Sequence, residues 1–341
     1  MESLLILAVS VAGAWFSMCA LVPLLHMRGV LDIPNNRSSH RVVTPRGGGT
    51  GIIVGMACGL VASWAVGQPL PRGELFVGVA LVALIGFADD CGENVPVVAR
   101  MTVQAVSAAV IVITAGGLPQ MPLPPPLDVP LGHAGSLLAI LWIITVTNIY
   151  NFLDGIDGFA GLQGVIAALG IALMAFLEGI WGVTALALAI AGGCVGFLAH
   201  NWHPARIFMG DVGSGTLGFL FAALPFEMPP ADRGVAVFST VLFLWFFLSD
   251  GTFTLLQRIK RGERPWEGHR SHLYQHLVKA GLRHDQVTLI VLVPGAVLAG
   301  LGLAVMYGNR TTGGWVVLAA AVLVFILYQR LTTTTVKARG R

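Results

Sequence analysis

A polar segment interrupts the apolar sequence near the middle of this 341-residue chain. The segment, residues 148–158, reads NIYNFLDGIDG and follows the uncharged run 137–146. A charged side chain at bilayer depth costs about 2.5–3.5 kcal/mol on insertion scales, so such a segment has to lie at a membrane edge, in a wet cavity or on a cation. Each of these positions makes it a candidate site of chemistry, and its polar side chains are Asn148, Asn151, Asp154 and Asp157.

Two glycines in the segment bear on whether these side chains converge. Each step of three residues turns a helix by about 300°, so an unbroken helix would carry Asp157 away from Asn148. Gly155 and Gly158 instead predict that the helix ends and the chain turns, which lets the four polar side chains converge. Polar residues that cap two successive helices are the alternative interpretation.

Two further motifs lie earlier in the chain. The stretch 37–49, RSSHRVVTPRGGG, puts Arg46 beside three glycines, where backbone amides and a guanidinium would bind an anion; a basic loop with a flexible helix start is the alternative. Asp89 and Asp90 end the sequence GFADD, and adjacent carboxylates repel unless one has a raised pKa or both share a cation or a cationic substrate group. Arg100 follows, either to reach a phosphate or to anchor the interface.

Two more motifs lie later. In FMGDVGSGTLGF, residues 208–219, a carboxylate and glycines precede an apolar run; they either cap a helix or offer amides to a phosphate while Asp211 holds a hard cation. Gly210 and Ser214 belong to the same motif. The basic stretch 258–281, which includes Arg270, His269, His272 and His276, is interpreted as an anion site or as a loop on anionic lipid headgroups.

The elements that must position these motifs are predicted to be membrane-spanning helices. The chain is 55% hydrophobic and only 11% charged, against about 25% charged residues in soluble domains. We therefore expect an all-α polytopic membrane protein with about eleven spans. The first is expected to be a retained helix rather than a signal peptide. The predicted spans are 3–25, 49–67, 74–88, 101–118, 135–151, 159–177, 181–199, 213–227, 234–257, 286–306 and 314–330.

The distribution of basic residues orients these spans. With eleven spans, the connections after the odd-numbered ones hold 17 of the 20 Lys and Arg residues, and only Arg72, Arg233 and Arg310 fall on the other side. The positive-inside rule then places the N-terminus outside and the C-terminus in the cytoplasm. We expect one transmembrane domain, residues 1–341, with cytoplasmic loops at about 26–48, 89–100, 151–160, 200–213 and 258–286. The four scattered cysteines predict neither a disulfide nor a zinc site.

All five motifs fall on one side of the membrane in this topology. Carboxylates and amides suited to Mg²⁺ or Mn²⁺, glycine-rich helix starts suited to phosphates, and Arg and His suited to leaving-group charge are the parts used in phosphoryl transfer. Because no soluble domain is predicted, one substrate is expected to be a lipid.

The five motifs in this order resemble those of the polyprenyl-phosphate N-acetylhexosamine-1-phosphate transferases, which belong to glycosyltransferase family 4. The likeness covers nearly the whole chain and is strongest to bacterial enzymes that start O-antigen-type glycans, chiefly through GERPWEGHRSHLYQHL at 262–277. The resemblance implies transfer of a sugar 1-phosphate from a UDP-N-acetylhexosamine to undecaprenyl phosphate at the cytoplasmic side of a bacterial inner membrane. It implies contact with membrane lipids and no nucleic-acid partner, and it is compatible with a homodimer.

The resemblance also implies roles for particular residues. Asp211 matches the main Mg²⁺ (or Mn²⁺) ligand, with Asn151 sharing the ion. The acidic pair Asp89 and Asp90 matches the residues that activate or hold the lipid phosphate, and His272 with Arg270 matches the loop that contacts the diphosphate. The remaining substrate-binding positions are Asn148, Asp154, Asp157 (near the uridine), Arg46, Arg100, Gly210 and Ser214.

The sequence departs from the family pattern in two places, one of which is Arg100, about one residue away from the usual basic position after the acidic pair. Tyr274 and Gln275 stand where better-known members carry further histidines, so His269 and His276 rank below His272. Asp250, about two turns before Arg258, is expected either to pair with an arginine of the following loop or to line a lipid groove.

Two other classes of protein are alternatives to the enzyme. A transporter or flippase of glycolipid precursors would place polar residues near the bilayer midplane, within inverted repeats. A glycan-assembly scaffold without activity would lack Asp89, Asp90, Asn151 or Asp211, and all four are present.

Overall fold

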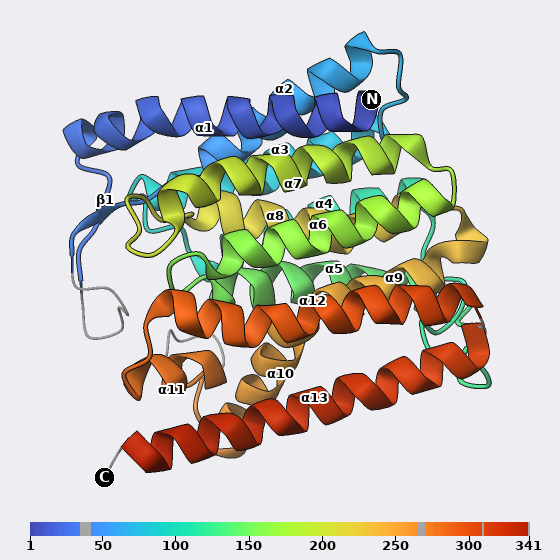
Figure 1. The fold of residues 1–341 in the computed structure, drawn as a ribbon. Helices are drawn as coiled ribbons and strands as arrows, with labels where there is room; N and C mark the ends of the chain where they lie inside the picture. The colour runs from blue at the N-terminus through green and yellow to red at the C-terminus, as the bar shows by residue number, and fades with distance from the viewer. Residues whose placement is uncertain (35–41, 265–269, 309, 340–341) are drawn as a thin grey trace.

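The computed structural model describes residues 1–34, 42–264, 270–308 and 310–339 and is built almost entirely of α-helices. Most of the long helices run side by side along one direction (Figure 1). Their bounds are α1 Glu2–Arg28, α2 Gly49–Ala65, α3 Gly73–Asp90, α4 Val97–Ala115, α5 Ala134–Leu153, α6 Phe159–Leu177, α7 Trp181–Asn201, α8 Asp211–Ala223, α9 Arg233–Phe243, α10 Trp245–Lys260, α11 Leu273–Lys279, α12 His284–Gly308 and α13 Arg310–Arg339. Two 3₁₀ turns, Leu224–Glu227 and Pro230–Asp232, and a pair of two-residue strands, β1 Leu31–Asp32 and β2 Thr44–Pro45, complete the described structure.

Helix α8 lies at the centre of the bundle. Every residue from Val212 to Ala223 is buried, as expected for a helix that is apolar all round and packs against α2, α3 and α5. Glycines permit the close approach: a Cβ at Gly49 of α2 would lie 2.1 Å from the Gly213 Cα, and one at Gly218 would lie 2.9 Å from the Thr147 Cα of α5. The glycine-rich sequence therefore serves helix packing.

Within the described residues, seven helices are long and apolar enough to cross a membrane, and the number is eight if a bent pair counts as one span. They are α1, α4, α5, α6, α7, α12 and α13, with the pair built from 230–243 and 245–260 as the eighth. Each of the eleven predicted segments coincides with helix in the described part of the chain, which confirms an all-α polytopic membrane protein. Helices α2, α3 and α8 are not among the seven, so eleven crossings and the orientation remain predictions.

The ninth predicted span, 234–257, was wrong as a single helix. The chain breaks at Leu244, and the two pieces meet at a bend of 79°. No proline or glycine stands at the break, so tertiary packing sets it. Helix α10 packs closely against α5: a Cβ at Gly251 would lie 2.7 Å from the Ile149 Cγ2.

The connecting segments gather at two ends of the bundle. The N-terminus lies at one end, whereas the C-terminus, β1 and α11 lie at the other (Figure 1). This arrangement agrees with an odd number of crossings. The short helix α11 and the β1–β2 pair, with Leu31 opposite Pro45 and Asp32 opposite Thr44, were not predicted from the sequence.

Candidate functional site

The start of α8 is capped by a carboxylate from another helix. Asp90, the last residue of α3, accepts hydrogen bonds from the backbone N–H of Asp211 at 3.0 Å and of Val212 at 3.0 Å, one on each oxygen. Gly210 precedes the helix with a φ of +76°, and a Cβ there would lie 2.4 Å from Asp90 Oδ2. Glycine is therefore required at position 210 both for its backbone conformation and for space.

This cap corrects two expectations about phosphate binding. The first amides of α8, expected to be free for a phosphate, are taken by Asp90. In the Arg46 motif, Gly48 N–H donates to Phe208 O at 2.9 Å and Gly49 N–H donates to Met209 O at 2.7 Å. Both sets of amides are therefore committed within the fold. Residues 37–41 of that motif lie outside the described part of the chain.

Arg46 closes the other side of the same junction. Its guanidinium donates to the backbone carbonyl of Asp89 at 2.7 Å and to that of Asp90 at 3.2 Å. It also lies 3.8 Å from Asp90 Oδ1. A cation at the C-terminal end of a helix is stabilised by the exposed carbonyls there, so Arg46 holds the end of α3 beside the start of α8.

Arg100 lies between the side chains of Asp211 and Asp89 and contacts both. Its Nη1 donates to Asp211 Oδ2 at 2.6 Å and lies 3.8 Å from Asp89 Oδ2. Asp89 also accepts from the Val95 N–H at 3.1 Å through its other oxygen. The side chain of Asp89 is 20% exposed and that of Asp90 only 3%. The two aspartates thus differ: Asp90 is buried in a cap, and Asp89 borders solvent.

The side-chain amides of Asn148 and Asn151, on α5, lie near Asp211 and Arg100. Asn151 Nδ2 donates to Ser214 Oγ at 2.9 Å, and Ser214 in turn donates to Gly210 O. Asn148 Nδ2 donates to Gln104 Oε1 at 2.6 Å. A pocket opens here. Its polar lining residues are Arg100, Gln104, Asn148, Asn151 and Asp211, and its other lining residues belong to α3, α4, α5 and α8.

The oxygen donors of this pocket fit a hard divalent cation. Asp211 offers a carboxylate that is about a quarter exposed, and Asn151 spends its amide hydrogen on Ser214, which leaves the amide oxygen for a ligand. Carboxylate and amide oxygens are the donors that Mg²⁺ and Mn²⁺ accept, and Mg²⁺ keeps several waters besides such ligands.

The turn predicted from Gly155 and Gly158 is present. Helix α5 ends at Leu153 and α6 begins at Phe159. Asp154 is half-buried in the turn, and burial together with the negative charges of Asp211, Asp90 and Asp157 raises its pKa to about 7. A Cβ at Gly155 would lie 2.2 Å from the Tyr274 hydroxyl, so this turn packs directly on α11.

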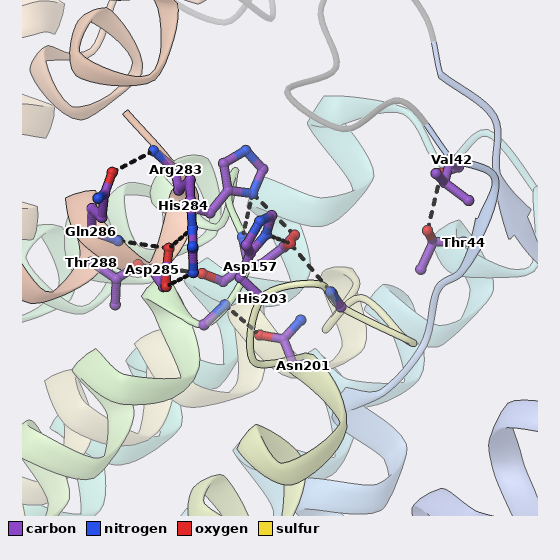
Figure 2. Close-up of polar contacts among 12 residues, drawn as sticks. Val42, Thr44, Asp157, Asn201, His203, Arg283, His284, Asp285, Gln286 and Thr288 are labelled. Atoms are coloured by element: carbon purple, nitrogen blue, oxygen red, sulfur yellow. Dashed lines mark hydrogen bonds and ion pairs between the residues drawn. The ribbon is translucent and has the colours of Figure 1, made fainter. Parts of the chain in front are cut away.

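The expected convergence of four polar side chains was wrong: Asn148 and Asn151 line the pocket, whereas Asp154 and Asp157 do not. Asp157 is buried against two histidines that the sequence analysis did not single out, His203 and His284 (Figure 2). His203 Nδ1 lies 2.6 Å from Asp157 Oδ2, and His284 Nδ1 lies 3.2 Å from Oδ1. Burial alone would raise the pKa of the Asp157 carboxyl, but hydrogen bonds with His284 and His203 hold that pKa below its usual value. A single histidine in a polar loop carries no sequence pattern, which is why both were missed.

His272 is held by Asp250 rather than by the pocket. Asp250, 2% exposed, accepts from Leu273 N–H at 3.0 Å and from Tyr274 N–H at 3.3 Å, and its Oδ1 lies 3.3 Å from His272 Nδ1. It therefore caps α11. Of the two alternatives for Asp250, pairing with an arginine of the following loop does not match these contacts, and lining a lipid groove stays a prediction. Arg258 pairs with Glu263 at 2.8 Å.

The other predicted residues of the basic stretch lie on or before α11, except His269. Arg270 precedes α11, and its backbone carbonyl accepts from the Lys279 ammonium. Gln275 closes the capping box with His272, and Tyr274 stacks near the His272 ring, with ring centroids 5.8 Å apart. His276 lies within α11. His269 falls outside the described residues.

Comparison with known proteins shows which family this chain resembles. Residues 74–228 match the family described as glycosyl transferase family 4. The chain is 29% identical to the Bacillus subtilis protein named "Probable undecaprenyl-phosphate N-acetylglucosaminyl 1-phosphate transferase", over 80% of this chain and 76% of that protein. It is 29% identical to a Haemophilus influenzae undecaprenyl-phosphate alpha-N-acetylglucosaminyl 1-phosphate transferase, over 94% and 91%. It is 27% identical to a Mycobacterium leprae decaprenyl-phosphate N-acetylglucosaminephosphotransferase, over 85% and 80%.

Proposed function

Because the chain belongs to the polyprenyl-phosphate N-acetylhexosamine-1-phosphate transferases of glycosyl transferase family 4, we propose that it transfers an N-acetylhexosamine 1-phosphate from a UDP-sugar to undecaprenyl phosphate. An oxygen of the lipid phosphate attacks the phosphorus that carries the sugar, and the bond from that phosphorus to the UMP oxygen breaks. The products are undecaprenyl-diphospho-N-acetylhexosamine and UMP. N-acetylglucosamine is the first donor to test, since the relatives' names carry it.

One observation carries the proposal on the structural side. A carboxylate, an amide and a guanidinium, from Asp211, Asn151 and Arg100, line one pocket at the end of the bundle where the polar loops gather. Phosphoryl transfer depends on positioning and on neutralising charge, and these three groups supply both kinds of contact. A soluble-substrate enzyme would not need the site at the end of membrane-spanning helices.

Each group has a role in this proposal. Asp211 and Asn151 hold Mg²⁺ or Mn²⁺, which neutralises charge on the diphosphate when bound. Arg100 turns from Asp211 to the phosphate oxygens as substrate enters. Asp89 faces the acceptor phosphate and orients it or takes its proton, because both oxygens of Asp90 are occupied by the α8 amides.

The topology and cellular role follow from the same proposal. The site faces the cytoplasm, where UDP-sugars are made, and the membrane is a bacterial inner membrane. The product starts assembly of a cell-surface glycan of the O-antigen type. His272 and Arg270, on the loop before α11, approach the diphosphate of the donor.

The test is a defined assay. Purified protein in detergent is incubated with undecaprenyl phosphate, Mg²⁺ and, one at a time, a panel of UDP-N-acetylhexosamines, and UMP release is scored together with formation of the diphospholipid. Release that requires both the lipid and one donor is expected. UMP release without lipid, or no release with any donor of the panel, would contradict the proposal.

A further inference from the structure

The side chain of Asp157 is enclosed by groups from two distant segments. Besides His203 Nδ1 at 2.6 Å, its Oδ2 accepts from the Ala205 N–H at 3.2 Å; its Oδ1 faces His284 Nδ1 at 3.2 Å. His203 and Ala205 belong to the loop between α7 and α8, and His284 begins α12. Figure 2 shows the two imidazoles on the carboxylate. The turn between α5 and α6 is therefore tied to both elements through one anion.

The backbone of Asp157 is held as well. Thr288 Oγ1 donates to its carbonyl at 3.3 Å, and the next residue, Gly158, donates its N–H to Asn201 Oδ1 at 2.9 Å. His284 Nδ1 also lies 3.3 Å from the Asp157 backbone nitrogen. That ring can thus donate to the carboxylate or accept from the amide, and it stays against Asp157 in either case.

The last residues of α5, which lead into this turn, reach the pocket. Asn151, which lines the pocket, is separated from Asp157 by only five residues, and Asp154 stands between them. Any freedom at Asp157 is therefore transmitted along a short stretch of backbone to the side-chain amide of Asn151.

We propose that His203 and His284 are positioning residues that clamp Asp157 and so lock the α5–α6 turn in the conformation that binds the UDP-sugar. The inference rests on the proposed function for its kinetic consequence. The clamp places the turn, and the turn carries the donor contacts. Loss of one imidazole weakens donor binding and leaves the lipid site unaffected.

The alternative to direct contacts is a metal ion, which one aspartate and two histidines could hold. The contacts favour the clamp. The 2.6 Å separation of His203 Nδ1 and Asp157 Oδ2 is a hydrogen-bond distance, and the same oxygen already accepts from Ala205. A ligand atom in a metal site would direct its lone pair at the ion instead.

The test uses paired substitutions at each histidine. In Asn, the side-chain nitrogen stands where Nδ1 of His stands; in Gln, it stands nearer the position of Nε2. His203→Gln and His284→Gln should raise KM for the UDP-sugar about tenfold or more, the loss expected for one charge-assisted hydrogen bond. KM for undecaprenyl phosphate should stay within about twofold. His203→Asn and His284→Asn should recover most of the loss.

Further readouts separate this clamp from a general loss of structure and from the proposed function. Amide hydrogen exchange at residues 155–158 should speed up in the Gln variants and not in the Asn variants, and this holds whether or not wild-type protein shows transferase activity. Inactive wild type would therefore refute the proposed function alone. Unchanged exchange in the Gln variants, or equal rises in both KM values, would overturn the clamp. So would stoichiometric zinc in purified wild type that disappears in His284→Gln.

Discussion

Arg100 Nη1 donates a 2.6 Å hydrogen bond to Asp211 Oδ2, so the guanidinium covers the carboxylate oxygen that we propose as a cation ligand. The pair is partly exposed, with 30% and 28% of the side chains accessible. Such a pair is held by a modest free energy, so the arginine can be displaced when a doubly charged ion and a diphosphate arrive together.

Replacement of Arg100 should separate its two effects. In Arg100→Gln the cation no longer competes with a guanidinium for Asp211, so half-maximal activity should need less Mg²⁺. The maximal rate should fall at least about tenfold, because a charge that neutralises the transferred phosphoryl group is gone. The measurement is a Mg²⁺ titration of UMP release. Arg206→Gln, an exposed arginine at the same end of the bundle, is the control; an identical response there would refute a specific role for Arg100.

Asp211→Asn should remove turnover while the protein stays folded in detergent. The amide keeps the shape of the side chain and lacks the charge that a hard cation requires. A loss of at least about a hundredfold in UMP release is expected, with an unchanged elution volume in size-exclusion chromatography. Asp128→Asn, in the linker between α4 and α5, is the matched control. Normal turnover in Asp211→Asn would refute the cation assignment.

Removal of divalent ions should stop the reaction reversibly. Excess EDTA is expected to abolish UMP release, and Mg²⁺ or Mn²⁺ added above the chelator should restore it. The Arg100–Asp211 pair persists without the ion, so the melting temperature should change little. Undiminished product formation in EDTA would argue against a divalent-ion mechanism.

The two adjacent aspartates should respond differently to the same change. Asp90→Asn replaces one of two acceptors with an NH₂ group that faces a backbone N–H, and the cost is about 1–3 kcal/mol of folding free energy. Asp89→Asn should leave stability nearly unchanged and lower turnover. Thermal unfolding in detergent and UMP release, measured side by side, distinguish the pair. Equal loss of stability in both variants would contradict the assignment.

Cys91 offers a test of the predicted topology. It is exposed directly after Asp90, at the end of the bundle that carries the site. A membrane-impermeant maleimide should label it in inverted inner-membrane vesicles and not in intact spheroplasts. Cys91→Ser should remove that labelling. Modification of Cys91 from the outside would reverse the proposed orientation.

Hydropathy alone predicted where the long apolar helices lie, though not α11 or the break in the ninth span, and the turn after Leu153 was predicted from two glycines. Both are local signals: an apolar run long enough for a helix, and residues that end one. The break at Leu244 had no such signal, because the flanking residues are Phe243 and Trp245, and the packing of α10 against α5 is a long-range contact.

The partners of the polar residues were harder to predict than their locations. Asp90 and Asp211 are separated by 121 positions, and Asp157 and His284 by 127. Sequence spacing says nothing about which distant amide or imidazole a carboxylate meets. Motif chemistry therefore selected Arg100, Asn148, Asn151 and Asp211, which line one pocket, and missed Gln104. Packing decided that the amides of Gly48, Gly49, Asp211 and Val212 are used inside the protein.

The cap on α8 also links activity to assembly of the helices within the membrane. The residue before the helix is Gly210, which has no side chain, so the first amides of α8 remain without a partner until α3 docks and delivers Asp90. The same contact brings Asp89 and Asp211 to one place. The helices can enter the bilayer before they pack against one another. At that stage the residues of the site are all present, but they are not yet brought together. Turnover is thus a measure of completed tertiary structure, and variants that insert normally can still be silent.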